Sequence, residues 1–183
     1  QEFGRDADEG YTIAPWFEEA GYDAFDADEG SYDAWYFAHP PVYQRHGLYL
    51  DHTKRLKEVV SAPVIVAGKN DIPELAESAL AERKADMIVL GRALLADPSW
   101  PQKVLSGKED QIRPCIGCHV GCMGRGFEGK HLSCAVNPAC GRERLYRIER
   151  IAEPRKALVV GGGVAGMEAA RVLSLRGFEV SLY

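Results

Sequence analysis

Five cysteines lie within residues 115–140, and their spacing predicts chemistry more clearly than any other pattern in this sequence. Four of them follow the pattern Cys115-x2-Cys118-x3-Cys122-x11-Cys134. An iron–sulfur cube needs four converging thiolates, and closely spaced cysteines on a tightly turning backbone provide three of them. The backbone can turn here because glycines stand between or beside the ligands, at Gly117, Gly121 and Gly124. We therefore predict that these four cysteines bind a [4Fe–4S] cluster, with Cys140 as a non-ligand thiol or the substitute fourth ligand.

Other uses of these cysteines remain open. The run Cys115–His119 is formally C-x-x-C-H, the haem attachment signature, but haem would leave two cysteines without a role. Structural zinc favours two separated C-x2-C pairs, whereas the second pair here is Cys134-x5-Cys140. A redox dithiol explains only two of the five thiols. We expect His119 and His131 to be solvated or to lie beside the ligands rather than to bind metal.

A second pattern occurs twice, 23 residues apart: four apolar residues, then glycine, then a basic residue, at 64–69 and 87–92. Each apolar run predicts a strand, and glycine lets a backbone N–H approach a ligand closely. The start of the following helix favours an anion. Barrel enzymes build a phosphate site in this way after their last two strands. The pair therefore predicts a phosphate site around Gly68, Lys69, Gly91 and Arg92.

A third pattern, G-x-G-x-x-G, follows a predicted strand at 157–160 and opens a predicted helix at 167–176. A second strand is predicted at 180–182. In this strand–turn–helix context the glycines predict a dinucleotide site at the helix N-terminus. Its residues are Gly161, Gly162, Gly163, Val164, Ala165 and Gly166. The acidic residue that holds the ribose is expected about 20 residues further on, where the chain stops, so we expect a sequence cut at both ends.

The elements that must position these residues alternate between strand and helix. Strands are predicted at 23–26, 63–67 and 87–90, and a helix is expected to begin at Asp71 and close at Arg83 and Lys84. Another helix is expected from Ala93 to about Asp97. This order predicts an α/β fold with a parallel sheet or barrel. We predict three parts: 1–107, a Cys-rich segment and connector at 108–150, and a nucleotide-binding start at 151–183.

Composition narrows the class of protein. The net charge of −5 does not support a nucleic-acid surface, and no run approaches the roughly 18 apolar residues of a membrane span. The N-terminus lacks the apolar stretch of a signal peptide. An odd number of clustered cysteines argues against a disulfide framework. We therefore expect a cytoplasmic protein that binds neither nucleic acid nor membrane.

Several motifs together resemble one known family, the multi-domain old-yellow-enzyme relatives: 2-enoate reductase, 2,4-dienoyl-CoA reductase and trimethylamine dehydrogenase. The resemblance covers essentially the whole chain and is most specific around the cysteines. The segments at 21–28, 31–36 and 38–41 are most similar to the 2-enoate reductases. The motifs that carry the family resemblance occur in one order, at 91–98, 112–119, 121–125, 133–143 and 161–166.

This resemblance implies a cofactor for each site. Residues 1–107 would be the C-terminal part of a (β/α)₈ TIM barrel whose Ala67–Lys69 and Gly91–Arg92 bind the FMN phosphate. Lys69 stands where many relatives have arginine, which replaces a fork of donors with a point charge. Cys115, Cys118, Cys122 and Cys134 match the cluster ligands of the family. Gly161, Gly163 and Gly166 would bind the pyrophosphate of FAD in a truncated Rossmann-like domain.

The resemblance also implies a reaction. NADH would reduce FAD, electrons would pass through the cluster to FMN, and the activated C=C bond of a 2-enoate would be reduced. Alternatives are a 2,4-dienoyl-CoA reductase using NADPH, an amine dehydrogenase, and a non-enzymatic metal-binding module. The partner is a small unsaturated acid or acyl-CoA. We name no catalytic residue and no oligomeric state, and we expect the fragment alone to be inactive. Tyr32, Tyr36 and His39 are candidates to line the substrate pocket.

Overall fold

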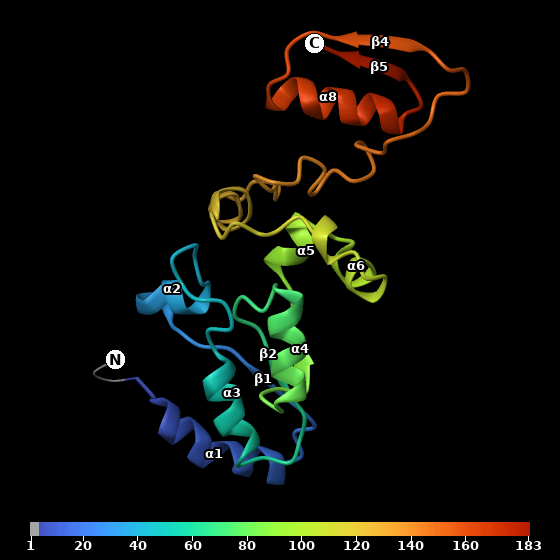
Figure 1. Cartoon of the computed structure of the whole chain (residues 1–183). Helices are drawn as coiled ribbons and strands as arrows, with labels where there is room; N and C mark the ends of the chain where they lie inside the picture. Colours follow the sequence, from blue (N-terminus) through green and yellow to red (C-terminus); the bar gives the residue numbers. More distant parts are fainter. Residues whose placement is uncertain (1–3) are drawn as a thin grey trace. The chain divides into compact units, whose positions relative to one another are not determined.

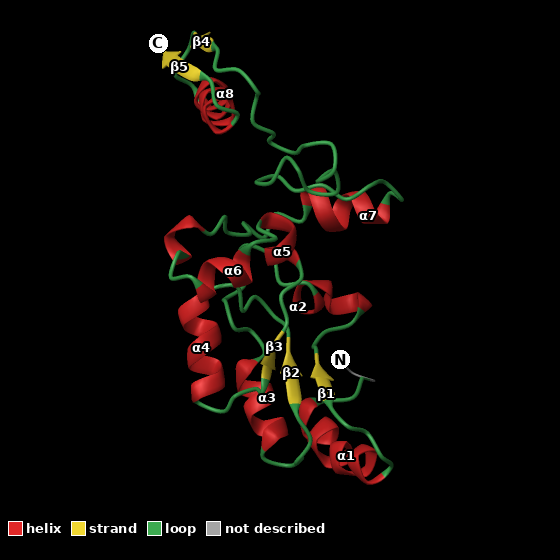
Figure 2. Ribbon diagram, turned by 90° about the vertical axis from the view of Figure 1, so that its right-hand side faces the viewer, coloured by secondary structure: helices red, strands yellow, loops and turns green. Residues whose placement is uncertain are grey.

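Three short parallel strands organise the first part of the chain. They are β1 (Phe25–Ala27), β2 (Val64–Val66) and β3 (Met87–Ile88), in the order β1-β2-β3. Phe25 is opposite Val64 and Ala27 is opposite Val66, while Ile65 is opposite Met87. All three strands point toward α2 (Trp35–Ala38) and α5 (Arg92–Ala96) (Figure 1, Figure 2). The predicted α/β class with a parallel sheet is therefore confirmed.

A computed structural model describes residues 4–183, and these residues form two units, residues 4–141 and residues 142–183. The remaining α-helices in the described part of the first unit are α1 (Ala7–Glu19), α3 (Leu50–Lys57), α4 (Pro73–Ala81), α6 (Trp100–Leu105) and α7 (Arg125–Phe127). No helix in the described part of the chain has the length and apolar character to cross a membrane. The predicted boundaries at 107/108 and 150/151 stay a prediction.

The core of the first unit lies between β2 and the helices α3 and α4. Val64 and Val66 are fully buried, as expected for β-branched residues of a strand that has a neighbour on both sides. Leu48, Tyr49 and Leu50 pack onto Val66 together with Ala79 and Ala85. This core fixes the carboxyl ends of β2 and β3, where the predicted phosphate residues follow.

Helix boundaries differ from the sequence predictions by a few residues. Helix α4 begins at Pro73, after an N-cap residue, Ile72, whose side chain does not cap the helix. Asp71 was expected to begin this helix, but its Oδ1 lies 3.0 Å from His46 Nδ1 instead. The helix ends at Ala81, before Arg83, which adopts a positive φ of 56°. Proline fits the first helical turn without a missing hydrogen bond, which explains the later start.

Residues 108–141 are mostly irregular and are held to the end of α5 by a few buried polar contacts. Asp97 is 3% exposed and accepts hydrogen bonds from Arg113 N at 2.8 Å and Ser99 N at 3.0 Å. Lys103 Nζ lies 2.5 Å from Asp97 Oδ2. Arg113 Nη1 donates to Ala96 O, and Asn137 Nδ2 donates to Leu95 O at 2.8 Å. The Cys-rich segment is therefore anchored at both of its ends to the same helix.

The second unit is a parallel strand pair with one helix. Strands β4 (Lys156–Val159) and β5 (Glu179–Leu182) flank α8 (Val164–Leu175), and Lys156 is opposite Glu179. Glycine at 177 has a φ of 91° and ends the helix, because the left-handed region suits glycine. The predicted strand–glycine–helix–strand order of this segment is therefore what the structure contains.

We predict that Asp97→Asn lowers stability by on the order of 2 kcal/mol, because the variant loses the charged acceptor of a buried cluster. Burial raises the pKa of Asp97, but hydrogen bonds from Arg113 N, Lys103 and Ser99 N outweigh it, so the net pKa is lowered. A lowered carboxyl pKa stabilises the fold above the unfolded value of about 3.9 and loses this effect as pH falls through the folded value.

The difference in melting temperature between the native protein and Asp97→Asn should therefore shrink below about pH 4. Melting curves at a series of pH values measure it. A difference that stays constant down to about pH 2 would contradict the assignment. Asp110→Asn, at an exposed residue of the same segment, is the matched control.

Candidate functional site

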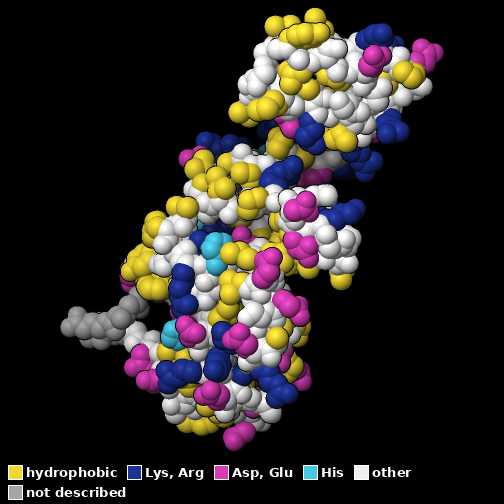
Figure 3. All heavy atoms as spheres, in the orientation of Figure 1, with side chains coloured by type: hydrophobic (Ala, Val, Ile, Leu, Met, Phe, Trp, Pro, Cys, Tyr) yellow, Lys and Arg dark blue, Asp and Glu magenta, His cyan; other side chains and the backbone are white. Residues whose placement is uncertain are grey.

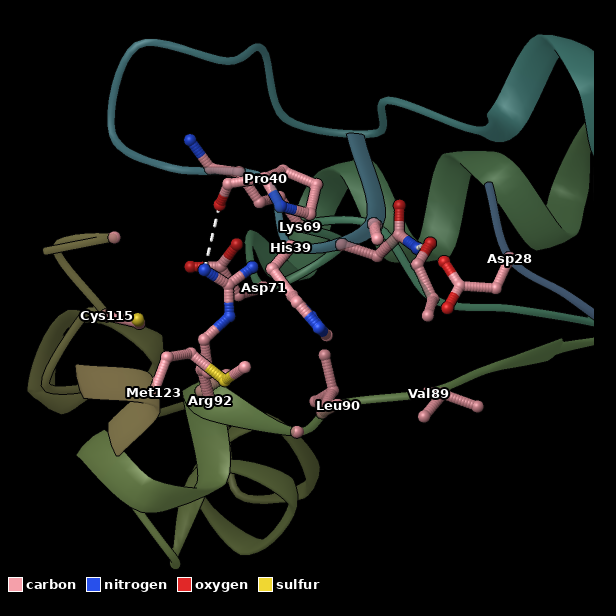
Figure 4. A pocket seen from close by; sticks show the side chains of 17 residues that line it. Asp28, His39, Pro40, Lys69, Asp71, Val89, Leu90, Arg92, Cys115 and Met123 are labelled. Atoms are coloured by element: carbon pink, nitrogen blue, oxygen red, sulfur yellow. Dashed lines mark hydrogen bonds between the residues drawn. The ribbon is translucent and has the colours of Figure 1, made fainter. Parts of the chain in front are cut away.

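A cavity of about 240 Å³ opens at the carboxyl ends of β2 and β3 (Figure 4). Two segments that lie 23 residues apart in sequence meet here because β2 and β3 are neighbours in the sheet. The loop after β1 adds Asp28, His39 and Pro40 to the lining. The lining includes every residue predicted to bind phosphate, namely Ala67, Gly68, Lys69, Gly91 and Arg92. The structure therefore brings this predicted set together, while its binding role stays a prediction.

The two basic residues of the cavity also hold the loop at 40–44. Lys69 Nζ donates to Gln44 O at 2.6 Å and to Pro41 O at 3.1 Å. Arg92 Nη1 donates to Pro40 O at 2.8 Å (Figure 4). Burial lowers the pKa of Lys69, Asp71 opposes this effect, and the charge of Arg92 lowers the pKa further. Each base thus has a second role, in positioning the loop, that the sequence pattern did not indicate.

The turn after β2 depends on Gly68, which has a φ of 94°. A Cβ at this position would lie 2.5 Å from the ring of Tyr49, which is buried. Lys69 continues the turn with a φ of 59°, and Leu48 N donates to Gly68 O at 3.0 Å. Gly91 differs, because it has no positive φ and a Cβ there would meet no atom within 4 Å.

Asn70 is a site residue that sequence reasoning missed. Its side chain is 1% exposed, and the residue lines the cavity directly after the turn. Asn70 Nδ2 donates to Ala67 O at 2.5 Å and to Val66 O at 3.4 Å. Within residues 4–183, Asn70 Oδ1 has no hydrogen-bond partner. The amide thus closes the end of β2, and only its position after the Gly–Lys pair could have pointed to it.

The four predicted cluster ligands line a single smaller cavity. Cys115, Cys118, Cys122 and Cys134 all contribute to its wall. Cys140 does not, and it is 2% exposed. This arrangement supports Cys134, rather than Cys140, as the fourth ligand.

Close backbone packing brings these cysteines around that cavity. Val120–Gly124 forms a π-helical turn, a form found often at functional sites. Ser133 N donates to Gly121 O at 2.9 Å, and a Cβ at Gly121 would collide with the Ser133 backbone. Glycine at 121 therefore lets the backbone at Ser133, directly before Cys134, approach the segment that carries Cys122.

The four cysteines line this cavity, but their side chains are not arranged as a metal-binding group in the described part of the chain. Among the residues that the structure describes, no three cysteine, histidine or carboxylate side chains are arranged to hold a metal ion. Burial raises the pKa of the Cys115 thiol, while the Gly117 N–H and the charge of Arg92 lower it. A cluster would need the four thiols to ionise, and the donor set, four thiols on one cavity, fits iron and sulfide.

The histidines of this segment differ in their surroundings. His119 lines the cysteine cavity, adopts a φ of 59° and accepts a hydrogen bond from Arg92 Nη1 at its Nε2. His131 is exposed, and its backbone oxygen accepts from Arg125 Nε at 2.7 Å. Burial and then the charge of Arg92 lower the pKa of His119.

Of the three aromatic candidates for a substrate pocket, His39 lines the larger cavity, whereas Tyr32 and Tyr36 are 91% and 46% exposed and lie outside its lining. Trp35 connects the group, with its ring centroid 4.3 Å from His39 and 5.9 Å from Tyr32. Figure 3 shows hydrophobic side chains gathered over α2, which carries Trp35 and Tyr36. Burial, and then Arg92, lower the pKa of His39.

The glycine run of the second unit lies between β4 and α8. Gly161 has a φ of 107°, and a Cβ at Gly166 would collide with the Gly161 carbonyl. Gly163 is the N-cap of α8 and leaves the helix N-terminus without a side-chain cap. The first backbone N–H groups of α8 thus remain available to an anion. Gly162, Val164 and Ala165 complete this turn, and their role in binding a nucleotide stays a prediction.

Comparison with known proteins finds a matching sequence family and similar individual proteins that are named as a reductase and an oxidase. The sequence model of the NADH:flavin oxidoreductase / NADH oxidase family matches residues 5–111. Cinnamate reductase of Clostridium sporogenes is 52% identical over 182 residues, which cover 100% of this chain and 27% of that protein. NADH oxidase of Thermoanaerobacter brockii is 41% identical over 184 residues, which cover 100% of this chain and 28% of that protein.

Among solved structures, 2-naphthoyl-CoA reductase in complex with 2-naphthoyl-CoA matches with a TM-score of 0.91 and 33% identity. The match covers 100% of this chain and 28% of that one. The chain thus spans about a quarter of the length of these relatives.

We predict that Gly68→Ala destabilises the first unit by roughly 2–4 kcal/mol, because the new methyl group meets the buried Tyr49 ring and the φ is strained. Gly91→Ala is the matched control and should change stability by less than about 1 kcal/mol, because its Cβ has open space. Urea or thermal unfolding of both variants measures this difference. Equal effects in the two variants would show that the turn at Gly68 is not constrained as described.

Proposed function

Because the chain belongs to the NADH:flavin oxidoreductase / NADH oxidase family, we propose that it is the flavin-phosphate and iron–sulfur segment of a longer reductase. The family match and the 52% identity to cinnamate reductase confirm the resemblance to old-yellow-enzyme relatives of the 2-enoate reductase type. The observation that carries the proposal is the adjacency of two cavities. The cavity at the ends of β2 and β3 and the four-cysteine cavity share Arg92 and Cys115 in their walls.

The first cavity fits the phosphate end of FMN. Gly91 leaves room for a ligand close to the backbone, Gly68 allows the turn after β2, and Lys69 and Arg92 supply positive charge. Lysine acts as a point charge and arginine as a fork of donors, so Arg92 would orient the phosphate while Lys69 neutralises it. Strands β1, β2 and β3 would belong to the C-terminal part of a (β/α)₈ TIM barrel. In such barrels, phosphate sites occupy this position after the last strands.

The second cavity fits a [4Fe–4S] cluster held by Cys115, Cys118, Cys122 and Cys134. Leu95, Ile116 and Val136 also line it and would keep water from the sulfur atoms. The glycine turn of the second unit, Gly161–Gly166, would bind the pyrophosphate of FAD through backbone N–H groups at the start of α8.

When bound, these groups supply two-electron exchange at the flavins and single-electron transfer at the cluster, which together carry reducing equivalents from NADH to an activated C=C bond. The residues of this chain would hold, orient and shield them. Lys69 and Arg92 would hold the phosphate and the loop at 40–44, which carries His39 to the cavity wall. With its pKa lowered, His39 would be a neutral imidazole near neutral pH.

The proposed substrate is a small α,β-unsaturated acid or its CoA ester. Cinnamate reductase and 2-naphthoyl-CoA reductase are named for substrates of this kind, in which an aryl ring is conjugated with the carboxyl or thioester carbon. Reduction of a 2-enoate with NADH is therefore the favoured activity, and a 2,4-dienoyl-CoA or an amine would be the alternative substrate.

We predict about four iron atoms and four acid-labile sulfides per complete enzyme chain. Cys118→Ser should lose the iron, because a serine hydroxyl replaces a ligand thiolate, while Cys140→Ser should retain it. Iron and sulfide analysis together with absorbance near 400 nm measures this outcome. Stoichiometric zinc in place of iron, or iron loss in Cys140→Ser alone, would contradict the proposed ligand set.

We also predict that the complete enzyme oxidises NADH under anaerobic conditions when cinnamate or another 2-enoate is added. Product analysis should show the saturated acid in amounts equal to the NADH consumed. Trimethylamine with an artificial electron acceptor is the contrasting assay. Turnover of the amine, without any NADH-dependent reduction of enoates, would replace the proposed reaction with amine oxidation.

A further inference from the structure

Arg92 stands in the wall between the two cavities. Arg92 and Cys115 both belong to the lining of the phosphate cavity and to the lining of the four-cysteine cavity. Arg92 is the first residue of α5, and Figure 4 shows its guanidinium pointing from that helix toward Pro40, with Cys115 and Met123 nearby. A single side chain therefore faces both candidate cofactor sites.

The contacts of Arg92 join the two loops that form these sites. Its Nη1 donates to Pro40 O at 2.8 Å on one side and to His119 Nε2 on the other. Pro40 belongs to the loop that Lys69 also holds, through Pro41 O and Gln44 O. His119 directly follows Cys118, a predicted cluster ligand. Arg92 thus links the phosphate-side loop to the cysteine loop through two hydrogen bonds.

The two loops are also packed tightly against each other. Gly117 has a φ of 62°, and a Cβ there would lie 2.8 Å from Val42 N. His119 has a φ of 59°, a left-handed conformation that histidine and asparagine adopt more readily than most residues. Because the backbones are in contact and the backbone at His119 is constrained, ordering one loop restricts the other.

We infer that Arg92 and His119 couple the binding of FMN phosphate to the seating of the cysteine loop, so that FMN protects the cluster. Within residues 4–183, both hydrogen bonds of the Arg92 side chain use Nη1, so its remaining N–H donors can face a phosphate without breaking the link to His119. A phosphate that fixes the guanidinium also fixes the two hydrogen bonds that the guanidinium makes. The coupling is therefore positive, and it is reciprocal. The inference rests on the proposed function.

The experiment compares iron release from the complete enzyme with FMN bound and after FMN has been removed, using an excess of an iron chelator and following the coloured complex. In the native protein, FMN should slow iron release by about five-fold or more. In His119→Ala, which removes the acceptor for Arg92, the ratio of the two rates should fall toward one. His119→Gln, which restores a polar acceptor at the same position, should recover part of the effect.

His131→Ala is the matched control, because His131 lies in the same cysteine segment but is exposed. It should retain the full effect of FMN on iron release. An undiminished effect in His119→Ala would overturn the inference while leaving the proposed cofactors in place. An equal loss in His131→Ala would also overturn it, because the effect would then not depend on the Arg92 contact.

A second measurement needs no variant. The affinity of the native enzyme for FMN, measured by quenching of flavin fluorescence, should fall when the cluster has been removed, because coupling between two binding equilibria is reciprocal. Equal affinities with and without the cluster would overturn the coupling. A complete enzyme that binds FMN but never contains iron would overturn both the coupling and the proposed cluster, whereas retained iron and flavin without coupling would leave the proposed function standing.

Discussion

The buried carboxylate of Asp97, at the end of α5, decides where the Cys-rich segment can lie. A carboxylate that is removed from water must find donors nearby, and here these are the backbone N–H groups of Ser99 and Arg113 and the ammonium group of Lys103. Arg113 stands two residues before Cys115, so the first ligand of the predicted cluster is fixed relative to α5. The opposite end of the same five-residue helix carries Arg92. Because one short helix serves both sites, the distance between them depends on that helix and on the hydrogen bonds that Asp97 accepts.

Much of this arrangement follows from local patterns in the sequence. The apolar β-branched runs predicted β2 and β3, and the repeated Gly–base ends predicted that Lys69 and Arg92 would meet, because parallel neighbouring strands end at one edge. Sequence could not show that both bases bind the carbonyls of Pro40, Pro41 and Gln44. Those contacts depend on a loop more than 20 residues away that has no periodic pattern.

The start of α4 shows the same limit from another side. Asp71 has the residue type and spacing of a helix N-cap, yet the structure gives that position to Ile72. The preference of Asp for the N-cap position is worth about 1 kcal/mol. Here Asp71 pairs instead with His46, which is distant in sequence, so local sequence rules could not predict this contact. The choice between Cys134 and Cys140 is similar. Spacing leaves both possible, and the contact of Gly121 with Ser133 brings Cys134 to the cavity that Cys122 lines.

The charges around the larger cavity explain why it suits an anion. Arg92 lowers the pKa of Lys69, His39 and His119, so the cations and potential cations of this region destabilise one another. Burial acts in the same direction, and it is the largest cause for each of these three groups. Asp71 offsets part of the effect at Lys69 only. A phosphate between Lys69 and Arg92 would remove this repulsion, and thiolates at the neighbouring cysteines would extend the compensation to His119. The two predicted cofactor sites therefore share one electrostatic requirement as well as one helix.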